Sequence, residues 1–151
     1  MTRQALNAEV RELTLVAAGA IPGALLRWQF EGQGVAAIGG LKGQIEGDIV
    51  ANLLGCLLIG LLYSRPRAPQ RLLLWGAIGF CGSLTTFSAW MLALVRALDR
   101  GAPLAALSVL LSSLLGGLLL VSLGRALGVL WFRRPGPGNK LAIEPATDSD
   151  R

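Results

Sequence analysis

Long uncharged, mostly apolar blocks alternate along the chain with short charged segments. The blocks are Leu13–Leu26, Ile49–Ser64, Leu72–Val95 and Gly101–Gly124. A helix needs about 20 predominantly apolar residues to cross the hydrocarbon of a bilayer. The last two blocks reach that length alone, and the first two reach it with their flanking residues at the interface. The pattern therefore predicts four transmembrane helices. They are expected at about 12–30, 46–64, 71–97 and 103–132.

These helices form one expected domain, residues 12–132, between two polar ends. Residues 1–11 are a short polar lead, and residues 133–151 are a Pro/Gly-rich tail that is expected to be disordered. Between the first two helices, a Gly-rich loop is expected at Glu31–Gln44.

Composition supports a membrane protein, because the chain is 53% hydrophobic and has a mean hydropathy of +0.58. Its net charge of +5 lies in short loops and tails, where Lys and Arg flank membrane spans. No nucleic-acid-binding module fits this pattern. We expect a multi-pass protein of the cell (inner) membrane, in contact with lipid and without a nucleic-acid partner.

The third predicted helix carries polar and helix-breaking residues at its centre. Irregular backbone survives at membrane depth only where it is buried in protein or lines a cavity, and transporters use broken helices to aim helix ends at ions. We therefore predict a helix broken at mid-membrane near the permissive Gly82, with hydroxyls capping the helix that follows. The alternative is a simple kink. The residues concerned are Gly82, Ser83, Thr85, Thr86 and Ser88.

Three side chains near this segment are candidates for an ion path. Asn52 lies in an apolar block, so its amide needs a partner, either an interhelical hydrogen bond or a permeating anion. Phe87 and Trp90 are three residues apart and share a helix face. Aromatic edges are positive and can meet an anion, although such a pair can also serve packing alone.

Two further groups extend the list. Ser108 and Ser112 share a face of the fourth helix and either line a path or bond to their own helix. Arg27, at the end of the first helix, either extends to the interface, anchors the structure or attracts anions to a mouth. Hydroxyls, an amide and aromatic edges suit a small anion in transit better than a reacting substrate.

Catalytic and proton-relay chemistry lacks suitable residues. The chain has no His, and no acid is expected inside the membrane. We therefore predict that the protein is not an enzyme. Four thin helices cannot enclose a pore by themselves, so an oligomer is expected.

Three motifs resemble the signatures of the Fluc/CrcB fluoride channel family. They are Gly-Ala-Leu-Leu-Arg-Trp at 23–28, Asn-Leu-Leu-Gly-Cys-Leu-Leu-Ile-Gly at 52–60 and Gly-Phe-Cys-Gly-Ser-Leu-Thr-Thr-Phe-Ser at 79–88. With four helices in matching order, the resemblance covers about residues 12–130. It implies an antiparallel, dual-topology dimer that exports fluoride passively. It also implies a structural Na⁺, not transported, held by the backbone carbonyls of Gly82 and Thr85.

The resemblance further implies roles along the fluoride path. Asn52 is the pore amide, Phe87 the first pore aromatic and Ser112 part of a hydroxyl track, and Arg27 matches the Arg of the first helix. Trp90 stands where the family usually has a second Phe.

The chain departs from the usual family pattern at four further positions: Ser108 stands in place of a Tyr, Ala89 in place of a Thr, Ser83 in place of a Gly and Asp48 in place of a Thr. They leave open a heterodimer with an oppositely oriented paralogue in place of a homodimer, or a non-conducting partner subunit. A small multidrug exporter is a weaker alternative, because it requires a membrane-embedded acid.

Overall fold

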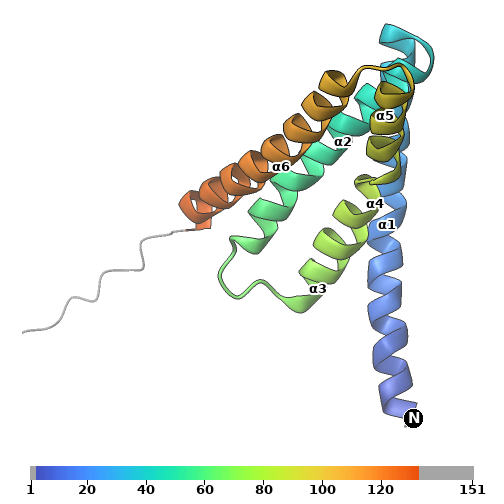
Figure 1. Cartoon of the computed structure of the whole chain (residues 1–151). Coiled ribbons are helices and arrows are strands. Elements are labelled where there is room, and N and C mark those ends of the chain that lie inside the picture. Colours follow the sequence, from blue (N-terminus) through green and yellow to red (C-terminus); the bar gives the residue numbers. More distant parts are fainter. Residues whose placement is uncertain (1–2, 133–151) are drawn as a thin grey trace, which may run out of the picture.

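The computed structural model describes residues 3–132, and the predicted tail at 133–151 lies outside them. Within the described range the chain forms helices and turns, without strands, which confirms the all-helical prediction. The elements, drawn in Figure 1, are α1 (Arg3–Ile38), α2 (Gly40–Tyr63), α3 (Gln70–Leu72), the π-helical η1 (Leu73–Cys81), α4 (Gly82–Leu84), α5 (Ser88–Asp99) and α6 (Pro103–Phe132).

Three helices of the described residues are long and apolar enough to cross a membrane. They are Arg3–Ile38, Lys42–Tyr63 and Pro103–Phe132. In α6 only 6% of the most apolar window is buried within the chain, so its leucines face outward, as in helices exposed to lipid or to another subunit. The path from Gln70 to Asp99 is divided into shorter pieces, and none of them is long enough on its own.

The Gly-rich segment between the first two helices is not the loop that we expected. α1 continues to Ile38, α2 begins at Gly40, and only the turn around Gly39 and Gly40 has positive φ, at 87° and 51°. Gly34 and Gly43 lie where the two helices touch, and a Cβ on either would overlap the backbone of the other. These glycines therefore permit close helix packing. α1 also begins at Arg3, so most of the expected polar lead is helical.

Glycines also set the contact between α1 and η1. A Cβ at Gly19 would overlap the carbonyl of Trp75, and one at Gly79 would overlap the carbonyl of Val16. The two backbones are therefore in direct contact, which places the start of the interrupted path firmly against α1.

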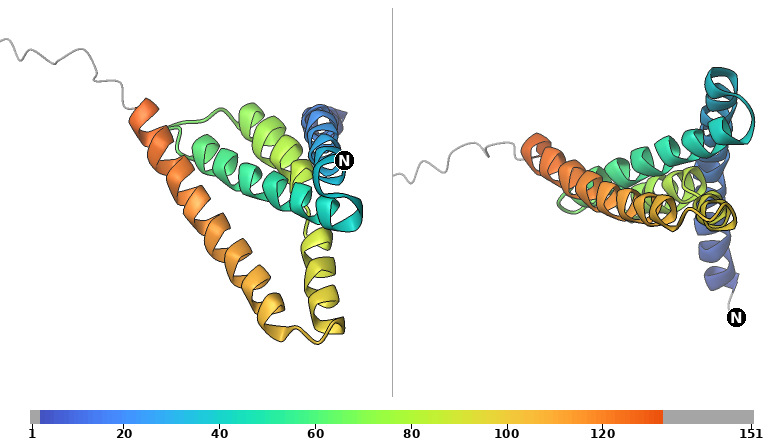
Figure 2. Two further views of the ribbon diagram at one scale, coloured as in Figure 1. Left: turned by 90° about the horizontal axis from the view of Figure 1, so that it is seen from above. Right: turned by 45° about the horizontal axis from the view of Figure 1, so that its top comes forward.

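α2 and α6 lie side by side, and α5 and α6 form a hairpin that turns at Gly101 (Figure 2). The α2–α6 contact has the same small-residue character. Gly60 meets the backbone of α6, and Gly124 meets the backbone of α2 at Leu57. This packing fixes α6 beside α2, and α5 also contacts α2.

Candidate functional site

The helical path that starts at Gln70 is interrupted at residues 85–87, between α4 and α5. Thr85 is extended, with φ −84° and ψ 147°, and Phe87 returns to helical dihedrals as the N-cap of α5. Gly82, where we expected the break, is helical, with φ −63° and ψ −33°. The break therefore lies three residues later than predicted, and it makes no use of glycine's access to positive φ.

The side chain of Asn52, on α2, holds the interrupted backbone. Its Nδ2 donates to the Thr86 carbonyl at 2.9 Å, and the Thr86 N–H donates to its Oδ1 at 2.7 Å. In an unbroken helix that N–H would donate to the carbonyl of Gly82. Asn52 thus has the interhelical partner that its burial requires. An amide NH₂ carries two N–H groups, and this contact uses one of them.

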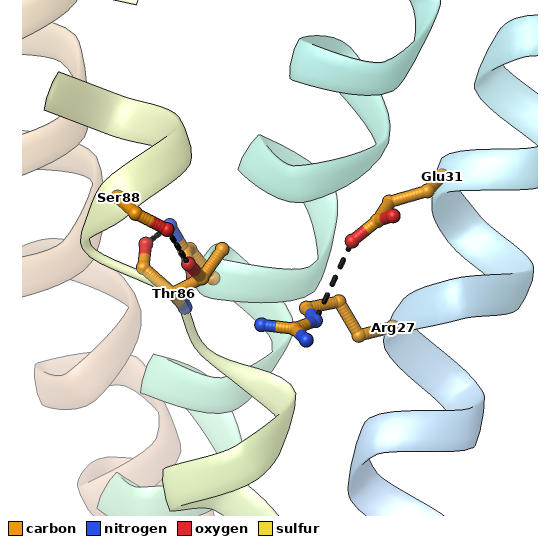
Figure 3. A network of polar contacts seen from close by, with 5 residues as sticks. Arg27, Glu31, Thr86 and Ser88 are labelled. Carbon is orange, nitrogen blue, oxygen red and sulfur yellow. Dashed lines mark hydrogen bonds and ion pairs between the residues drawn. The ribbon is translucent and has the colours of Figure 1, made fainter. Parts of the chain in front are cut away.

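The expected hydroxyl caps are absent, and no side chain caps α5. Ser83 Oγ lies 2.8 Å from the carbonyl oxygen of Ala20 on α1, and Thr85 Oγ1 donates to a carbonyl four residues earlier. The hydroxyls of Thr86 and Ser88 bond to each other at 2.9 Å (Figure 3). Ser and Thr hydroxyls often donate to preceding carbonyls of their own helix, as Ser83 and Thr85 do here. These bonds stabilise the backbone on the N-terminal side of the break.

A cavity of about 390 Å³ lies against the break, between α2, α5 and α6. We call it the aromatic cavity, because Phe87 and Trp90 line it together with Asn52, Thr86 and mostly apolar side chains. The ring centroids of Phe87 and Trp90 are 5.2 Å apart, with the rings tilted by 53°. The structure therefore brings together three of the predicted path residues, one from α2 and two from the break and α5.

The predicted serines of α6 do not line this cavity. Ser108 and Ser112 are exposed, and each donates to a carbonyl three residues earlier in its own helix. Ser113 lines the cavity instead. A sequence signal for it exists, because Ser113 lies seven residues after the buried Ala106 and four before the buried Gly117, which is the spacing of one helix face.

A second cavity, of about 230 Å³, also reaches Thr86 and lies between α1, α2 and α5. We call it the charged cavity, because Arg27, Glu31 and Asp48 line it. Figure 3 shows the guanidinium of Arg27 extending from α1 toward the break, with its Nε 3.4 Å from Glu31 Oε1. Thr86 lines both cavities, so they adjoin at the break.

Asp48 is an acid buried among the helices, at a position that we expected near the membrane interface. It lies in the candidate span Lys42–Tyr63, and only 4% of its surface is exposed. The sequence placed it at the interface because it borders an apolar block. It also precedes Asn52 by four residues, which puts both on one face of α2, and that spacing could have identified it.

Gly82 and Thr85, the expected carbonyl donors to a metal ion, lie at the end of the helical path before the break. Gly82 is exposed, and Thr85 is partly buried. Among residues 3–132 no three His, Cys, Asp or Glu side chains gather as a metal site. The carbonyls at the break are therefore the candidate cation ligands that merit a test.

These features define a small helical membrane protein whose interrupted helix borders two adjoining cavities, as in channels and transporters. The chain matches the sequence profile of the family described as CrcB-like protein, Camphor Resistance (CrcB), over residues 14–125. The chain belongs to this family, which confirms the resemblance drawn from the three motifs.

Named relatives agree with this assignment. The chain is 46% identical to the "Fluoride-specific ion channel FluC 2" of Parasynechococcus marenigrum over 140 residues, which cover 93% of this chain and 95% of the relative. It is 47% identical to a protein of the same name from a Synechococcus species, over 82% of this chain and 85% of the relative. The chain is 40% identical to "Fluoride-specific ion channel FluC" of Pseudomonas putida, over 76% of this chain and 94% of the relative. These relatives are named as ion channels, in agreement with the prediction that the chain is not an enzyme.

Proposed function

We propose that the chain is a subunit of a fluoride channel that lowers cellular fluoride by passive export across the cell (inner) membrane. The observation that carries this proposal is the pair of hydrogen bonds by which Asn52 opens the helix beside the aromatic cavity. The identity of the ion comes from the relatives, which are named as fluoride-specific channels.

Fluoride exchanges its water for neutral donors in the aromatic cavity. The second N–H of the Asn52 amide is one such donor. The other is the indole N–H of Trp90, because Nε1 is buried and has no hydrogen-bond partner among the described residues. Aromatic edges of Phe87 and Trp90 add positive potential. No charged side chain lines this cavity, so the anion is held without the tight binding that would prevent its release.

The interrupted path from Gln70 to Asp99 is a fourth membrane span, and two chains of opposite orientation complete the channel. Support comes from α6, whose apolar face and outward Ser108 and Ser112 are not covered within the chain. A second copy would bring those hydroxyls onto the path, where the family resemblance places Ser112. An oppositely oriented paralogue would serve equally well, and the mass of the complex formed by this chain alone distinguishes the two.

A structural Na⁺, not transported, binds the carbonyls of Gly82 and Thr85. The residues present fit such an ion, since the Thr86 N–H donates to Asn52 and leaves the Gly82 carbonyl without its usual helical donor. Unwound carbonyls are typical Na⁺ ligands in membrane proteins. Two oxygens are too few for a complete shell, so the second chain supplies the others.

The small multidrug exporter is the weaker candidate. Asp48 is a buried acid of the kind that such an exporter requires. However, the match to the channel family extends over residues 14–125, and the aromatic cavity lacks a carboxylate for an organic cation. The channel therefore remains the better proposal.

Efflux from liposomes that hold this chain alone tests the proposal. Fluoride should leave far faster than from protein-free vesicles, and chloride should not. Fluoride efflux at the protein-free rate, or equal efflux of chloride, would overturn it.

A further inference from the structure

We propose that Asp48 controls the charge at one mouth of the fluoride path, so that the flux is low while Asp48 is ionised and rises when it takes up a proton. This inference rests on the proposed fluoride channel and names a residue that regulates it.

The position of Asp48 places its charge next to the path. Asp48 lines the charged cavity, and Thr86 separates that cavity from the aromatic cavity. An anion that enters or leaves the aromatic cavity on this side therefore passes the side chains of the charged cavity. Charges lining a cleft with apolar walls act strongly on a passing ion, because the field is concentrated there.

The charges around this cavity do not balance. Arg27 and Glu31 on α1 contribute one positive and one negative charge, and Asp48 on α2 adds a second negative charge. α5 contributes only the uncharged Ser88 and Leu92. With all three groups ionised the cavity carries a net charge of −1, which repels an anion.

The nearby charges that do not line the cavity are Lys42 and Glu46 on α2 and Arg96 on α5, whose Nη1 is buried without a hydrogen-bond partner among the described residues. Lys42 and Glu46, also on α2, lie 3.9 Å from each other, are largely exposed and do not line the cavity. They cancel each other and leave the cavity as it is.

The environment of Asp48 favours the protonated, neutral form of its carboxyl group. The residue is 4% exposed, and its Oδ1 is buried without a hydrogen-bond partner in the described part of the chain. The guanidinium of Arg27 pairs with Glu31, and no ion pair to Asp48 is present among residues 3–132. The Asp48 carboxyl has Glu31 as a side-chain hydrogen-bond neighbour and Arg27 as a nearby positive charge, but two acids beside one base leave a buried negative charge uncompensated, which is costly. A proton on Asp48 removes that cost and brings the net charge of the cavity to zero.

Fluoride efflux from liposomes, measured with the full chain at about pH 8 down to about pH 5.5, tests the proposal. Asp48→Asn should conduct about tenfold faster than wild type near neutral pH and low salt, where electrostatic effects on ion entry are large. Wild-type flux should rise toward that of the variant as pH falls, while the variant changes little. Glu46→Gln, which removes an exposed acid two residues away, should behave as wild type. Protein-free vesicles at each pH correct for HF that crosses the lipid.

Equal flux and equal pH dependence in wild type and Asp48→Asn would overturn the inference, as would a slower variant with the wild-type pH dependence. If Asp48→Asn does not reconstitute, wild-type flux with added impermeant salt decides. Screening should raise it near neutral pH, and an unchanged flux counts against the inference. Absence of fluoride flux from wild type at every pH would overturn the proposed channel function and this inference together.

Discussion

The two cavities that meet at Thr86 both border the helix break, but they differ in the charge of the side chains that line them. The aromatic cavity, of about 390 Å³, has no charged side chain in its wall, whereas the charged cavity, of about 230 Å³, is lined by one base and two acids. In the proposed channel, this difference would give the two cavities separate roles along the anion path. Neutral donors hold a dehydrated ion weakly enough to release it, and fixed charges near the entrance control how often an ion arrives.

A charged side chain in the aromatic cavity would remove the difference between the two cavities. We expect this change to have the largest effect on fluoride efflux. Asn52→Asp exchanges the amide donor for a carboxylate, which repels fluoride and loses the bond to the Thr86 carbonyl. Because buried charges without partners are strongly unfavourable, fluoride efflux from liposomes should fall at least about a hundredfold. Asn7→Asp makes the same exchange at an exposed position of α1 and should leave the efflux unchanged. Normal efflux in Asn52→Asp would exclude this residue from the path.

Removal of an aromatic ring should have the next largest effect. Phe87→Ile keeps the wall apolar but deletes the positive ring edge that faces the ion, so flux should fall about tenfold, of the order expected for one aromatic contact. Tyr63→Ile is the matched control, because Tyr63 is 61% exposed, close to the 68% of Phe87, and lies outside the cavity. Similar losses in both variants would assign the effect to a general aromatic contribution and not to the path.

The indole N–H allows a finer test of the neutral donors. Trp90→Phe keeps an aromatic ring but removes the unpaired donor at Nε1, and one hydrogen bond to a charged group accounts for roughly a tenfold change. We expect a drop of about threefold to tenfold in the ratio of fluoride to chloride efflux, which is the range expected for the loss of one such bond. Trp75→Phe, on η1 and stacked on Phe80, should keep the wild-type ratio. An unchanged ratio in Trp90→Phe would show that the indole only fills space.

The smallest expected effect separates the two neighbouring serines of α6. Ser113→Ala removes a hydroxyl from the wall of the aromatic cavity and should lower flux by about twofold, since a single neutral hydrogen bond contributes modestly. Ser112→Ala changes flux only if a second chain brings that exposed hydroxyl to the path. A reduction confined to Ser112→Ala would favour the track that the family resemblance implies over the cavity within one chain.

The sequence was sufficient for the all-helical membrane class and for several residues of the aromatic cavity. Apolar blocks indicate long helices, and Asn52 drew attention because a polar amide in an apolar block needs a partner, whereas Phe87 and Trp90 drew attention because they share a helix face beside the predicted break. Their proximity in the structure depends on α2 crossing the break. That crossing is a tertiary contact between positions 34 residues apart, and a single sequence does not specify such a pairing.

The residues that were misjudged share one physical cause. Gly82 suggested the break through its backbone freedom, yet the break occurs where the Asn52 amide replaces helical hydrogen bonds. Gly34 and Gly43 suggested a loop, yet they serve close contact between helices. Asp48 was expected near the membrane interface, and the structure buries it between α1 and α2. In each case the neighbouring helix, and not the local sequence, determines what the residue does.

The bonds from Asn52 to Thr86 have a consequence for how the channel could be lost. Without that amide, the N–H of Thr86 would be free to bond to the carbonyl of Gly82, and the gap between α4 and α5 could rewind into one continuous helix. Rewinding would occupy the Gly82 oxygen that we propose as a sodium ligand and would move the ring of Phe87 at the same time. If both proposed sites exist, a mutation of Asn52 is therefore expected to abolish sodium and fluoride binding together.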